Sequence, residues 1–334
     1  MALEPEVSVI IPARDEESNL AACLDSLIDQ AGVSFEIIVV DDHSTDRTRQ
    51  IAESYPQVRV LEARPLVPGW TGKANAIRTA IPVAKGQWFL FTDADTVHLS
   101  GSLERSLREA KTDGLAMLSY SPKQEANSFW ERAIQPVVFA ELSRKFAYED
   151  INDPDSQRAA ANGQYILIQR SSYDAIGQHD GVKSSLLEDV DLARAIKQKG
   201  RLRFRYGPDA VSARMYRGLH ELVAGWTKNL AALFPGVLAL AIVRLLESLA
   251  LLCGPLLILA LLLRRQFSFA VVALFVTLGC YIGFARRLRK AGWRLSRSPS
   301  SVLGLPLFAY LLLRSYFMYR FRRKVSWKGR SYPT

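Results

Sequence analysis

Acidic side chains recur in this chain directly after short apolar stretches, at a spacing that suits chemistry on a charged ligand. Asp93 and Asp95 are separated by one residue and follow the apolar run Trp88 to Phe91. Two carboxylates so placed at a strand end can both reach one divalent cation, and a hard ion such as Mg²⁺ or Mn²⁺ prefers oxygen ligands together with diphosphate oxygens. Such a cation neutralises the charge that develops on a departing phosphate. The sequence therefore predicts a metal site at Asp93 and Asp95.

Acidic residues also follow two apolar stretches near the start of the chain. Val7 to Ile11 runs into Pro12-Ala13-Arg14-Asp15-Glu16-Glu17, and Phe35 to Val40 runs into Asp41-Asp42. Carboxylates at such strand ends accept hydrogen bonds from a base or from ribose hydroxyls, which selects a nucleotide without contacting its phosphates. An ordinary acidic loop with a helix cap explains either segment taken alone.

A third acidic cluster, Glu188-Asp189-Val190-Asp191, stands at the start of a predicted helix. A carboxylate beside a metal-bound sugar can remove the proton of an attacking hydroxyl if its pKa suits that task. Acids at a helix N-terminus are also stabilised by the helix dipole, which explains one acid more easily than three. We therefore expect a catalytic carboxylate in this cluster.

The elements that must position these residues follow a regular pattern. Predicted strands alternate with segments whose apolar residues recur at helical spacing, and polar residues follow the carboxyl ends of the strands. This pattern predicts an α/β fold with an open, mostly parallel sheet and a ligand crevice at those strand ends. The predicted strands are Val7 to Ile11, Phe35 to Val40, Val58 to Leu61, Trp88 to Phe91, Leu115 to Tyr120 and Tyr165 to Ile168.

Basic residues are concentrated in the last third of the chain. The formal charge of the whole chain is +10, yet residues 231–334 carry 16 Lys and Arg residues against one acid. These residues flank apolar segments at 237–263, 267–285 and 302–319, whereas a nucleic-acid-binding protein would carry them on its folded domain. We therefore predict no nucleic-acid partner, a catalytic domain over 1–230 and a membrane domain over 231–334.

The same charges predict an orientation in the membrane. Nothing in the first residues predicts a signal peptide, and the basic stretches 286–297 and 320–330 should both stay cytoplasmic. Three full spans cannot satisfy that condition, so 302–319 is expected to dip in and return or to lie in the interface. An ordinary third span with the tail outside is the alternative. We expect a multi-pass protein of the cytoplasmic (inner) membrane whose catalytic domain faces the cytoplasm.

Five segments occur in the order and at the spacing of one known family: VSVIIPARDEE, IIVVDDHSTDRT, GWTGKANA, FLFTDADT and LLEDVDLA. Through them the chain resembles a family 2 glycosyltransferase with the GT-A fold over about residues 5 to 230. The resemblance implies that Asp41 and Asp42 contact the base and ribose of a nucleotide-sugar. It also implies that Asp93 and Asp95 contact the metal and diphosphate, and that Asp189 is the base with Glu188 beside it.

Other residues of these segments are expected to complete the donor site. Pro12, Arg14 and Glu16 should line the nucleotide-sugar site, and Lys73 of GWTGK would approach the nucleotide or diphosphate. A solvated loop lysine is the ordinary alternative for Lys73. His98 could be a further metal ligand, but we favour the interpretation that it is an ordinary polar residue of the next loop.

The chain is most similar to the membrane-bound members that glycosylate hopanoids, carotenoids or ceramide. The similarity rests on GWTGK, TDADT, NGQYILI and RMYRG followed by GWTKN. Processive and ceramide-type relatives carry a Q/R-x-x-R-W element, whereas here a glycine follows Arg214-Met215-Tyr216-Arg217. Arg214 and Arg217 are still able to hold a diphosphate through bidentate hydrogen bonds, but the aromatic floor for an acceptor sugar is absent. Transfer is therefore expected to be non-processive.

These features predict an inverting, metal-dependent enzyme that moves a sugar from a nucleotide-sugar, expected to be a UDP-sugar, to a hydroxyl of a membrane lipid or isoprenoid. Transfer to a polyprenyl phosphate is a second hypothesis, because the same fold serves both acceptors. A non-catalytic, nucleotide-binding membrane scaffold is a third, but a scaffold has no need to gather carboxylates that repel one another without a metal. The sequence makes no prediction about the oligomeric state.

Overall fold

The computed structural model describes residues 4–333 and divides the chain into two compact units. The first comprises Met1–Glu125 and Phe146–Met215, and the second comprises Ala126–Lys145 and Tyr216–Thr334. The second unit therefore contains the helices α5 (Phe129–Lys145) and α9 (Leu219–Leu233) in addition to the apolar C-terminal segments.

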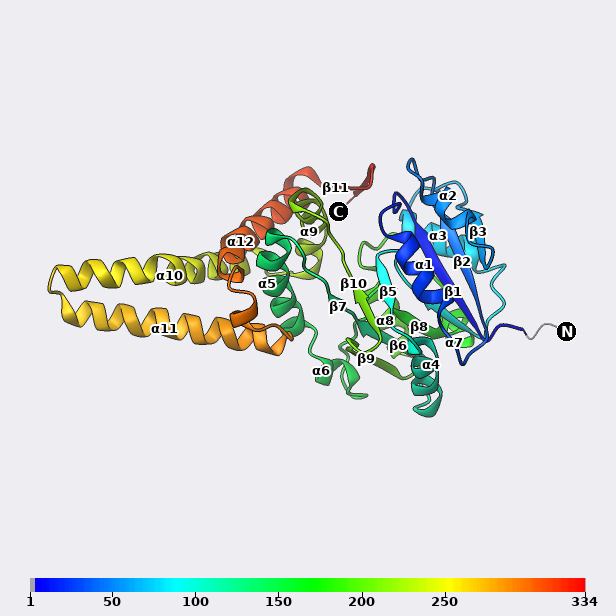
Figure 1. Ribbon diagram of the computed structural model, residues 1–334, viewed down its shortest axis with the longest axis horizontal. Helices are drawn as coiled ribbons and strands as arrows, with labels where there is room; N and C mark the ends of the chain where they lie inside the picture. The colour runs from blue at the N-terminus through cyan, green and yellow to red at the C-terminus, as the bar shows by residue number, and fades with distance from the viewer. Residues whose placement is uncertain (1–3, 334) are drawn as a thin grey trace. The chain divides into compact units, whose positions relative to one another are not determined.

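A seven-stranded sheet organises the first unit (Figure 1). Its strand order is β3-β2-β1-β4-β8-β6-β9, and only β8 runs antiparallel to its neighbours. The predicted α/β fold with a mostly parallel sheet is confirmed. The strands are β1 (Val7–Ala13), β2 (Phe35–Asp41), β3 (Val58–Glu62), β4 (Trp88–Phe91), β6 (Met117–Ser121), β8 (Ile166–Gln169) and β9 (Leu202–Tyr206).

Helices cover both faces of this sheet because alternate residues of each strand point to opposite sides. In β1, Val9 and Ile11 belong to the core shared with α1 and α4, whereas Ile10 belongs to the core shared with α3 and α8. Each face is thus closed by its own continuous apolar core. The helices are α1 (Leu20–Ile28), α2 (Thr48–Glu53), α3 (Gly72–Ala80), α4 (Ser102–Thr112), α6 (Tyr148–Asn152), α7 (Arg170–Ala175) and α8 (Glu188–Lys197).

Strand β1 continues through Pro12 to Ala13, two residues beyond its predicted end at Ile11. Pairing with β4 stops at Ile10, whereas pairing with β2 continues to Ala13. Proline has no N–H to donate and is therefore tolerated where a neighbouring strand has already ended. A second sheet of three short strands, β5 (Thr96–His98), β10 (Val211–Ala213) and β7 (Lys123–Gln124), was not predicted.

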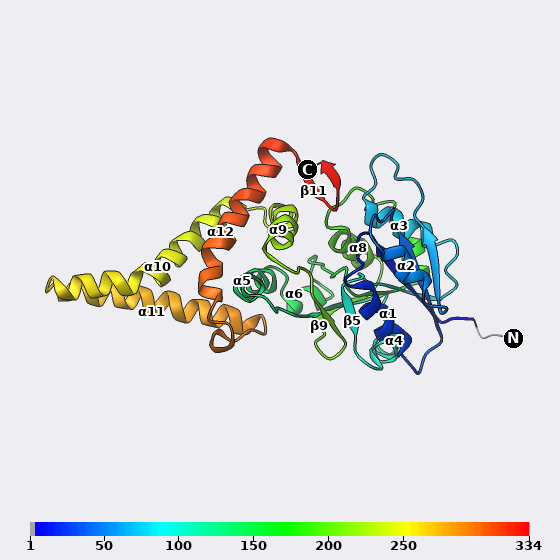
Figure 2. The same cartoon turned by 45° about the horizontal axis from the view of Figure 1, so that its top comes forward.

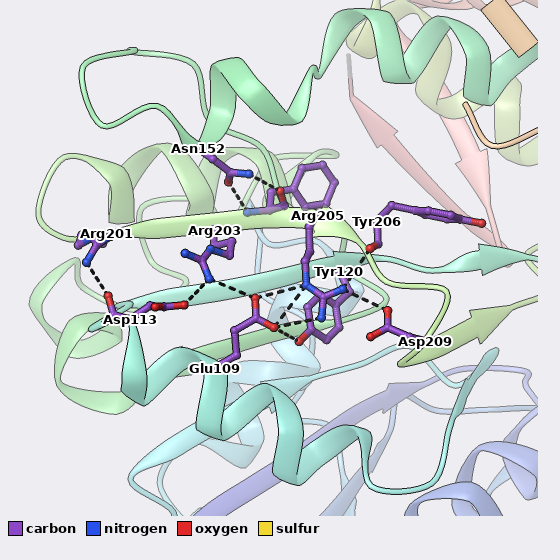
Figure 3. A network of polar contacts seen from close by, with 10 residues as sticks. Glu109, Asp113, Tyr120, Asn152, Arg201, Arg203, Arg205, Tyr206 and Asp209 are labelled. Carbon is purple, nitrogen blue, oxygen red and sulfur yellow. Dashed lines mark hydrogen bonds and ion pairs between the residues drawn. The ribbon is translucent and has the colours of Figure 1, made fainter. Parts of the chain in front are cut away.

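Charged side chains cover the edge strand β9 of the large sheet (Figure 3). Glu109 of α4 pairs with Arg203 and Arg205 at 3.4 and 3.0 Å, and it accepts a hydrogen bond of 2.8 Å from the Tyr120 hydroxyl. Arg203 also pairs with Asp113, and the Arg205 guanidinium lies 4.2 Å from the centre of the Tyr120 ring. We call these five residues the Glu109 network. Charges on an edge strand oppose pairing with a strand of another molecule.

The second unit contains three helices that are long and apolar enough to cross a membrane. In Figure 2, α10 (Val237–Leu263) and α11 (Phe267–Lys290) lie side by side and are joined by a short turn. The third is α12 (Ser301–Phe317), which continues as a π-helical turn to Arg322. A hairpin of β11 (Lys324–Trp327) and β12 (Arg330–Pro333) ends the described chain.

Helix α12 differs from the other two apolar helices in its surroundings. Within its most apolar window 44% of the residues are buried, against 17% for α10 and 11% for α11. It packs on α5 and α9, and Gly304 lets it approach so closely that an added Cβ would strike the Ala133 carbonyl of α5. The helix is continuous, so the chain does not turn back within it.

Four charged side chains join α5, α10 and α11 inside the second unit. Arg244 lies 3.1 Å from Glu141, and it also pairs with Glu247 one helical turn further along α10. Arg287 of α11 pairs with Glu247 and lies 3.7 Å from Glu141. We call these residues the Glu141 cluster. The two arginines balance the two carboxylates, so burial leaves no net charge among the four.

Candidate active site

The acidic segments all follow strands whose carboxyl ends lie at one edge of the large sheet. Asp41 is the last residue of β2 and pairs in register with Ala13, the last residue of β1. On the other side of β1, the Thr92 amide continues from β4 and donates to the Ile10 carbonyl at 3.2 Å. Because β1, β2 and β4 are parallel, the loops that carry the three acidic motifs of this part of the chain leave the sheet together.

The loops after β1 and β2 are tied to each other by hydrogen bonds. The Arg14 guanidinium donates to the carbonyls of Asp42 and His43 at 2.6 and 3.2 Å. The Asp15 carboxylate in turn accepts a hydrogen bond of 2.8 Å from the Thr45 amide. Arg14, predicted to line the nucleotide-sugar site, therefore also fixes the backbone of the Asp41-Asp42 loop.

Asp41 and Asp42 are held at this edge with only 4% of their surface exposed. The Ser44 amide donates to Asp41 at 3.3 Å, which turns the loop back over the strand end. Glu16 lies at the start of α1, where its carboxylate accepts a hydrogen bond of 2.7 Å from Asn19. Pro12 occupies the penultimate position of β1 and is partly exposed.

Lys73 joins two acidic motifs that are far apart in the sequence. Its ammonium lies 2.7 Å from Asp93 and 3.0 Å from Glu188. Lys73 is in the first turn of α3, which Thr71 caps by accepting a hydrogen bond from the Ala74 amide. The alternative of a solvated loop lysine is therefore wrong. Burial alone would lower the pKa of Lys73, but Asp93, Glu188 and Asp189 together raise it well above its usual value, so the ammonium stays charged.

Asp189 lies beside Lys73 at the N-terminus of α8. Its carboxylate accepts hydrogen bonds from the Gly163 amide at 3.0 Å and from the Val190 amide at 2.8 Å. Burial, followed by the neighbouring Glu188 carboxylate, raises the pKa of Asp189 to about 6, although Lys73 and the two amides oppose the rise. A carboxylate with a pKa near 6 is ionised at neutral pH and is still basic enough to accept a proton.

Gly163 is a site residue that the sequence did not reveal. A Cβ at this position would lie 2.5 Å from the Lys73 ammonium and 3.7 Å from the Asp189 carboxylate. An added Cβ would therefore displace the Lys73 ammonium but would not disturb the Asp189 carboxylate. The segment NGQYILI contributed to the resemblance to the family, but nothing in the neighbouring sequence indicates that its glycine lies beside the charged site residues.

Gln164, the next residue, was not predicted as a site residue either. It contacts Asp95, one of the two predicted metal ligands. Its amide nitrogen lies 3.2 and 3.3 Å from the two carboxylate oxygens of Asp95. Gln124 of β7 supports Gln164 with a hydrogen bond of 3.3 Å. The Arg214 amide, just after β10, donates to the Asp95 carbonyl at 3.4 Å, so the small sheet brings Arg214 to this site. Arg217 belongs to the second unit, where its amide donates to Glu221 at 2.8 Å.

A buried thiol shows that the acidic segment after β1 and the acidic segment after β4 lie close together. Burial, and then the carboxylates of Asp95, Glu16 and Asp93, raise the pKa of Cys23 far above its usual value. Cys23 lies on α1, and its sulfur is 3.8 Å from the Asp93 carbonyl. The carboxylates that follow β1 and β4 therefore share one region of negative potential.

The residues at this site fit a divalent cation accompanied by a diphosphate. Asp93 and Asp95 offer oxygen donors, and the carboxylates of Glu188 and Asp189 lie nearby around the Lys73 ammonium. Within residues 4–333 no group of three or more acidic, histidine or cysteine side chains has the arrangement of a complete metal site. Mg²⁺ and Mn²⁺ need only one or two carboxylates when phosphate oxygens complete their coordination shell, and Asp93 and Asp95 are two such carboxylates.

His98 has a structural position on β5. Its ring is buried, and Nε2 lies 3.1 Å from the Thr92 hydroxyl. Burial lowers the pKa of His98 to about 3, so the ring is neutral at physiological pH. We infer that His98 anchors the strand that carries Asp93 and Asp95.

The chain resembles known proteins in sequence and in structure. A family model described as Glycosyl transferase family 2 matches residues 8–177. A 4,4'-diaponeurosporenoate glycosyltransferase of Staphylococcus aureus strain USA300 is 25% identical over 339 residues, covering 98% of this chain and 88% of the relative. The solved mannosyltransferase PcManGT from Pyrobaculum calidifontis, in complex with GDP-Man and Mn²⁺, matches with a TM-score of 0.54 and 16% identity. That match covers 96% of this chain and 89% of the solved one, and it shows a shared fold.

Proposed function

The chain belongs to glycosyl transferase family 2 and has the GT-A fold, and from that premise we propose that it transfers a sugar from a nucleotide-sugar to an apolar acceptor held in the membrane. The observation that carries the proposal is the contact of Lys73 with both Asp93 and Glu188, beside the Asp189 carboxylate. Three segments that are distant in the sequence thus supply charges to one centre. A chain without catalytic function has no reason to keep such a concentration of carboxylates together.

The donor in this proposal is a nucleotide-sugar bound along the edge of the sheet. Asp41 and Asp42 accept hydrogen bonds from the base and ribose, with Arg14 holding their loop in place. The solved PcManGT is a complex with GDP-Man and Mn²⁺, which supports a nucleotide-sugar and a divalent cation in this fold. Asp93 and Asp95 would hold the cation, whose charge would stabilise the departing diphosphate. We propose a UDP-sugar as the donor.

Asp189 acts as the general base in the proposed reaction. It removes the proton of the acceptor hydroxyl, whose oxygen forms a bond to the anomeric carbon from the face opposite the leaving diphosphate. The bond between that carbon and the diphosphate oxygen breaks with its electron pair on the diphosphate, which inverts the anomeric configuration. Gly163 and Val190 orient the carboxylate, and Lys73 keeps it ionised.

The acceptor in this proposal is an isoprenoid or lipid of low polarity. The diaponeurosporenoate named for the Staphylococcus aureus relative is a carotenoid-type carboxylate, and that relative aligns with 98% of this chain, including the three apolar helices. Helices that hold the enzyme at a bilayer raise the rate at which it meets an acceptor that stays there. We propose that residues 1–230 face the cytoplasm from the inner membrane, and that α12 lies against α5 and α9 at the interface.

The proposal is tested by incubating membranes that contain the full-length chain with UDP- and GDP-sugars in the presence of Mn²⁺, and by weighing the product lipids by mass spectrometry. The expected product is an apolar lipid heavier by one hexose. Asp189→Asn should abolish it when the acceptor reacts through a hydroxyl. A carboxylate or polyprenyl phosphate acceptor is already ionised, so either one would leave substantial transfer in this variant.

The matched control is Asp191→Asn, two residues away on the same helix. Asp191 instead contacts Ser185 at 2.7 Å and Arg194 at 2.6 Å. Its variant should transfer sugar at nearly the rate of the unaltered enzyme. Equal loss in both variants would contradict the role of Asp189, and absence of any glycosylated lipid across the panel would contradict the proposed function.

A further inference from the structure

A cavity of about 280 Å³ lies in the second unit, apart from all residues of the proposed donor site. Its walls are formed by the start of α5 and by the segment that joins α11 to α12. Three arginines and one tryptophan dominate the lining, and no acidic residue lines it. The residues are Ala126, Arg132, Gly292, Trp293, Arg294, Arg297 and Ser298. We call this cavity the arginine pocket.

Local structure fixes both walls of the arginine pocket. At the start of α5, the Ser128 hydroxyl donates to the Glu131 carboxylate at 2.7 Å and accepts a hydrogen bond of 3.3 Å from the Glu131 amide. This sets the position of Arg132, whose guanidinium also donates to the Ala126 carbonyl at 3.2 Å. Gly304 of α12 then packs directly on the Ala133 carbonyl, next to Arg132 in the chain.

The opposite wall begins with the end of α11. Gly292 has a φ of +81°, and the Trp293 amide donates to the Leu288 carbonyl at 2.9 Å, which is the hydrogen bond of a Schellman motif. The chain therefore turns sharply after α11, and Trp293 and Arg294 line the pocket together with Arg132 of α5. A 3₁₀ turn, Leu295–Arg297, places Arg297 beside them.

The three guanidinium groups of this pocket are not neutralised by the protein. Within residues 4–333 none of Arg132, Arg294 and Arg297 has a carboxylate within ion-pair distance. Guanidinium groups that converge without carboxylates are suited to bidentate hydrogen bonds with a phosphate group. The pocket therefore has the chemistry of an anion site.

The surroundings of the pocket place it where a bilayer surface would be. It lies between the end of one apolar helix, α11, and the start of another, α12. Phe129 and Trp130 precede Arg132 on α5, with 51% and 40% of their surface exposed and ring centres 5.2 Å apart. Exposed aromatic residues next to basic residues are typical of the lipid headgroup region.

Because these three arginines have no carboxylate partner in the described part of the chain and lie between two apolar helices, we infer that the arginine pocket binds the phosphate group of an anionic phospholipid. The lipid would bridge the start of α5 and the turn after α11, which both line the pocket. Its apolar chains would lie along the exposed side chains of α11.

The test compares two double variants that lose the same charge near the same end of α11. R294Q/R297Q removes two guanidinium groups that line the pocket, whereas R286Q/R289Q removes two exposed groups of α11 that do not line it. Full-length protein is incorporated into nanodiscs of phosphatidylcholine with added phosphatidylglycerol, and the lipid retained after transfer to detergent is counted by native mass spectrometry.

The unaltered protein should retain phosphatidylglycerol in preference to phosphatidylcholine, and R294Q/R297Q should bind it at least about tenfold more weakly. R286Q/R289Q should retain it as the unaltered protein does. An equal loss in both double variants would show diffuse attraction to the basic segment and would overturn the inference. If R294Q/R297Q fails to fold, R132Q decides in the same way, because Arg132 reaches the pocket from α5.

Competition distinguishes the sources of the phosphate group. Inorganic phosphate or glycerol phosphate should not displace the retained phosphatidylglycerol at matched concentration, because neither carries the apolar chains. Displacement by either one would show a site for a soluble anion. Preferential retention of a polyprenyl phosphate over phosphatidylglycerol would instead assign the pocket to an acceptor, and both results would overturn the phospholipid assignment.

Discussion

Replacing Lys73 with glutamine should move the acidic limb of the pH profile of sugar transfer. In the unaltered enzyme the pKa of Asp189 is about 6, so the base is protonated below that pH and kcat/KM should rise as pH increases through 6. The Lys73 ammonium favours the ionised form of Asp189 and thereby holds this pKa down. Without the ammonium the pKa must rise, and the acidic limb must move to higher pH.

The size of this shift follows from the position of Gly163. The Lys73 ammonium and the Asp189 carboxylate lie 2.5 and 3.7 Å from the place of a Cβ on that glycine, so they cannot be more than about 6 Å apart. At an effective dielectric constant of about 20, charges at that separation interact by about 3 kcal/mol, which corresponds to about two pH units. Lys73 keeps 31% of its side chain exposed, so solvent screening reduces the expected shift to between about one and two units.

The assay is the pH dependence of kcat/KM at fixed Mn²⁺ and donor concentrations, since this parameter reports groups of the free enzyme. The matched control is Lys85→Gln in the same unit, where the side chain is exposed and the residue precedes β4, at the opposite end of that strand from Asp93. Its limb should stay near pH 6. An unchanged limb in Lys73→Gln, or an equal shift in Lys85→Gln, would refute the electrostatic reasoning.

Three further predictions concern the site and its support. Asp93→Asn should lower transfer at saturating Mn²⁺ at least about 100-fold, because a metal ligand that stabilises the leaving diphosphate contributes several kcal/mol; unchanged transfer would remove Asp93 from the metal site. Gly163→Ala should reduce kcat with little change in melting temperature, because its Cβ displaces the Lys73 ammonium, whereas Gly181→Ala meets nothing within 4 Å and should be neutral in both measurements. Glu109→Gln should lower stability by about 1–3 kcal/mol in thermal unfolding without changing KM, because Arg203 and Arg205 lose their shared carboxylate. The exposed pair of Glu104 with Arg108 supplies the control for that variant, and an equal loss in Glu104→Gln would contradict the burial argument.

The sheet and the positions of its acidic loops could be predicted because they depend on local patterns. Buried parallel strands require continuous apolar runs, and the polar residues after Val40 and Phe91 end those runs abruptly. Helix α3 was not predicted because it begins with Gly72, a residue of low helix propensity, although Thr71 is a capping residue. The strands of the small sheet have only two or three residues, so their pairing depends on segments far apart in the chain.

The contacts of the site residues could be predicted less well than their identities. Asp93, Glu188 and Asp189 are conspicuous as acids in any reading of the sequence. The contact of Lys73 with both Asp93 and Glu188 depends on the approach of the first turns of α3 and α8 in space, which no local pattern specifies. Gly163 and Gln164 matter only because of the side chains that approach them in space.

The Glu141 cluster bears on how the proposed membrane helices would enter a bilayer. Arg244 and Glu247 pair within one turn of α10, so this helix would carry its two charges into a bilayer as a neutral pair. Arg287 emerges 40 residues after Glu247 and completes the ion pairs only when α11 has followed. Glu141, which precedes both helices in the chain, would then link the α10–α11 hairpin to α5 through its ion pairs with Arg244 and Arg287.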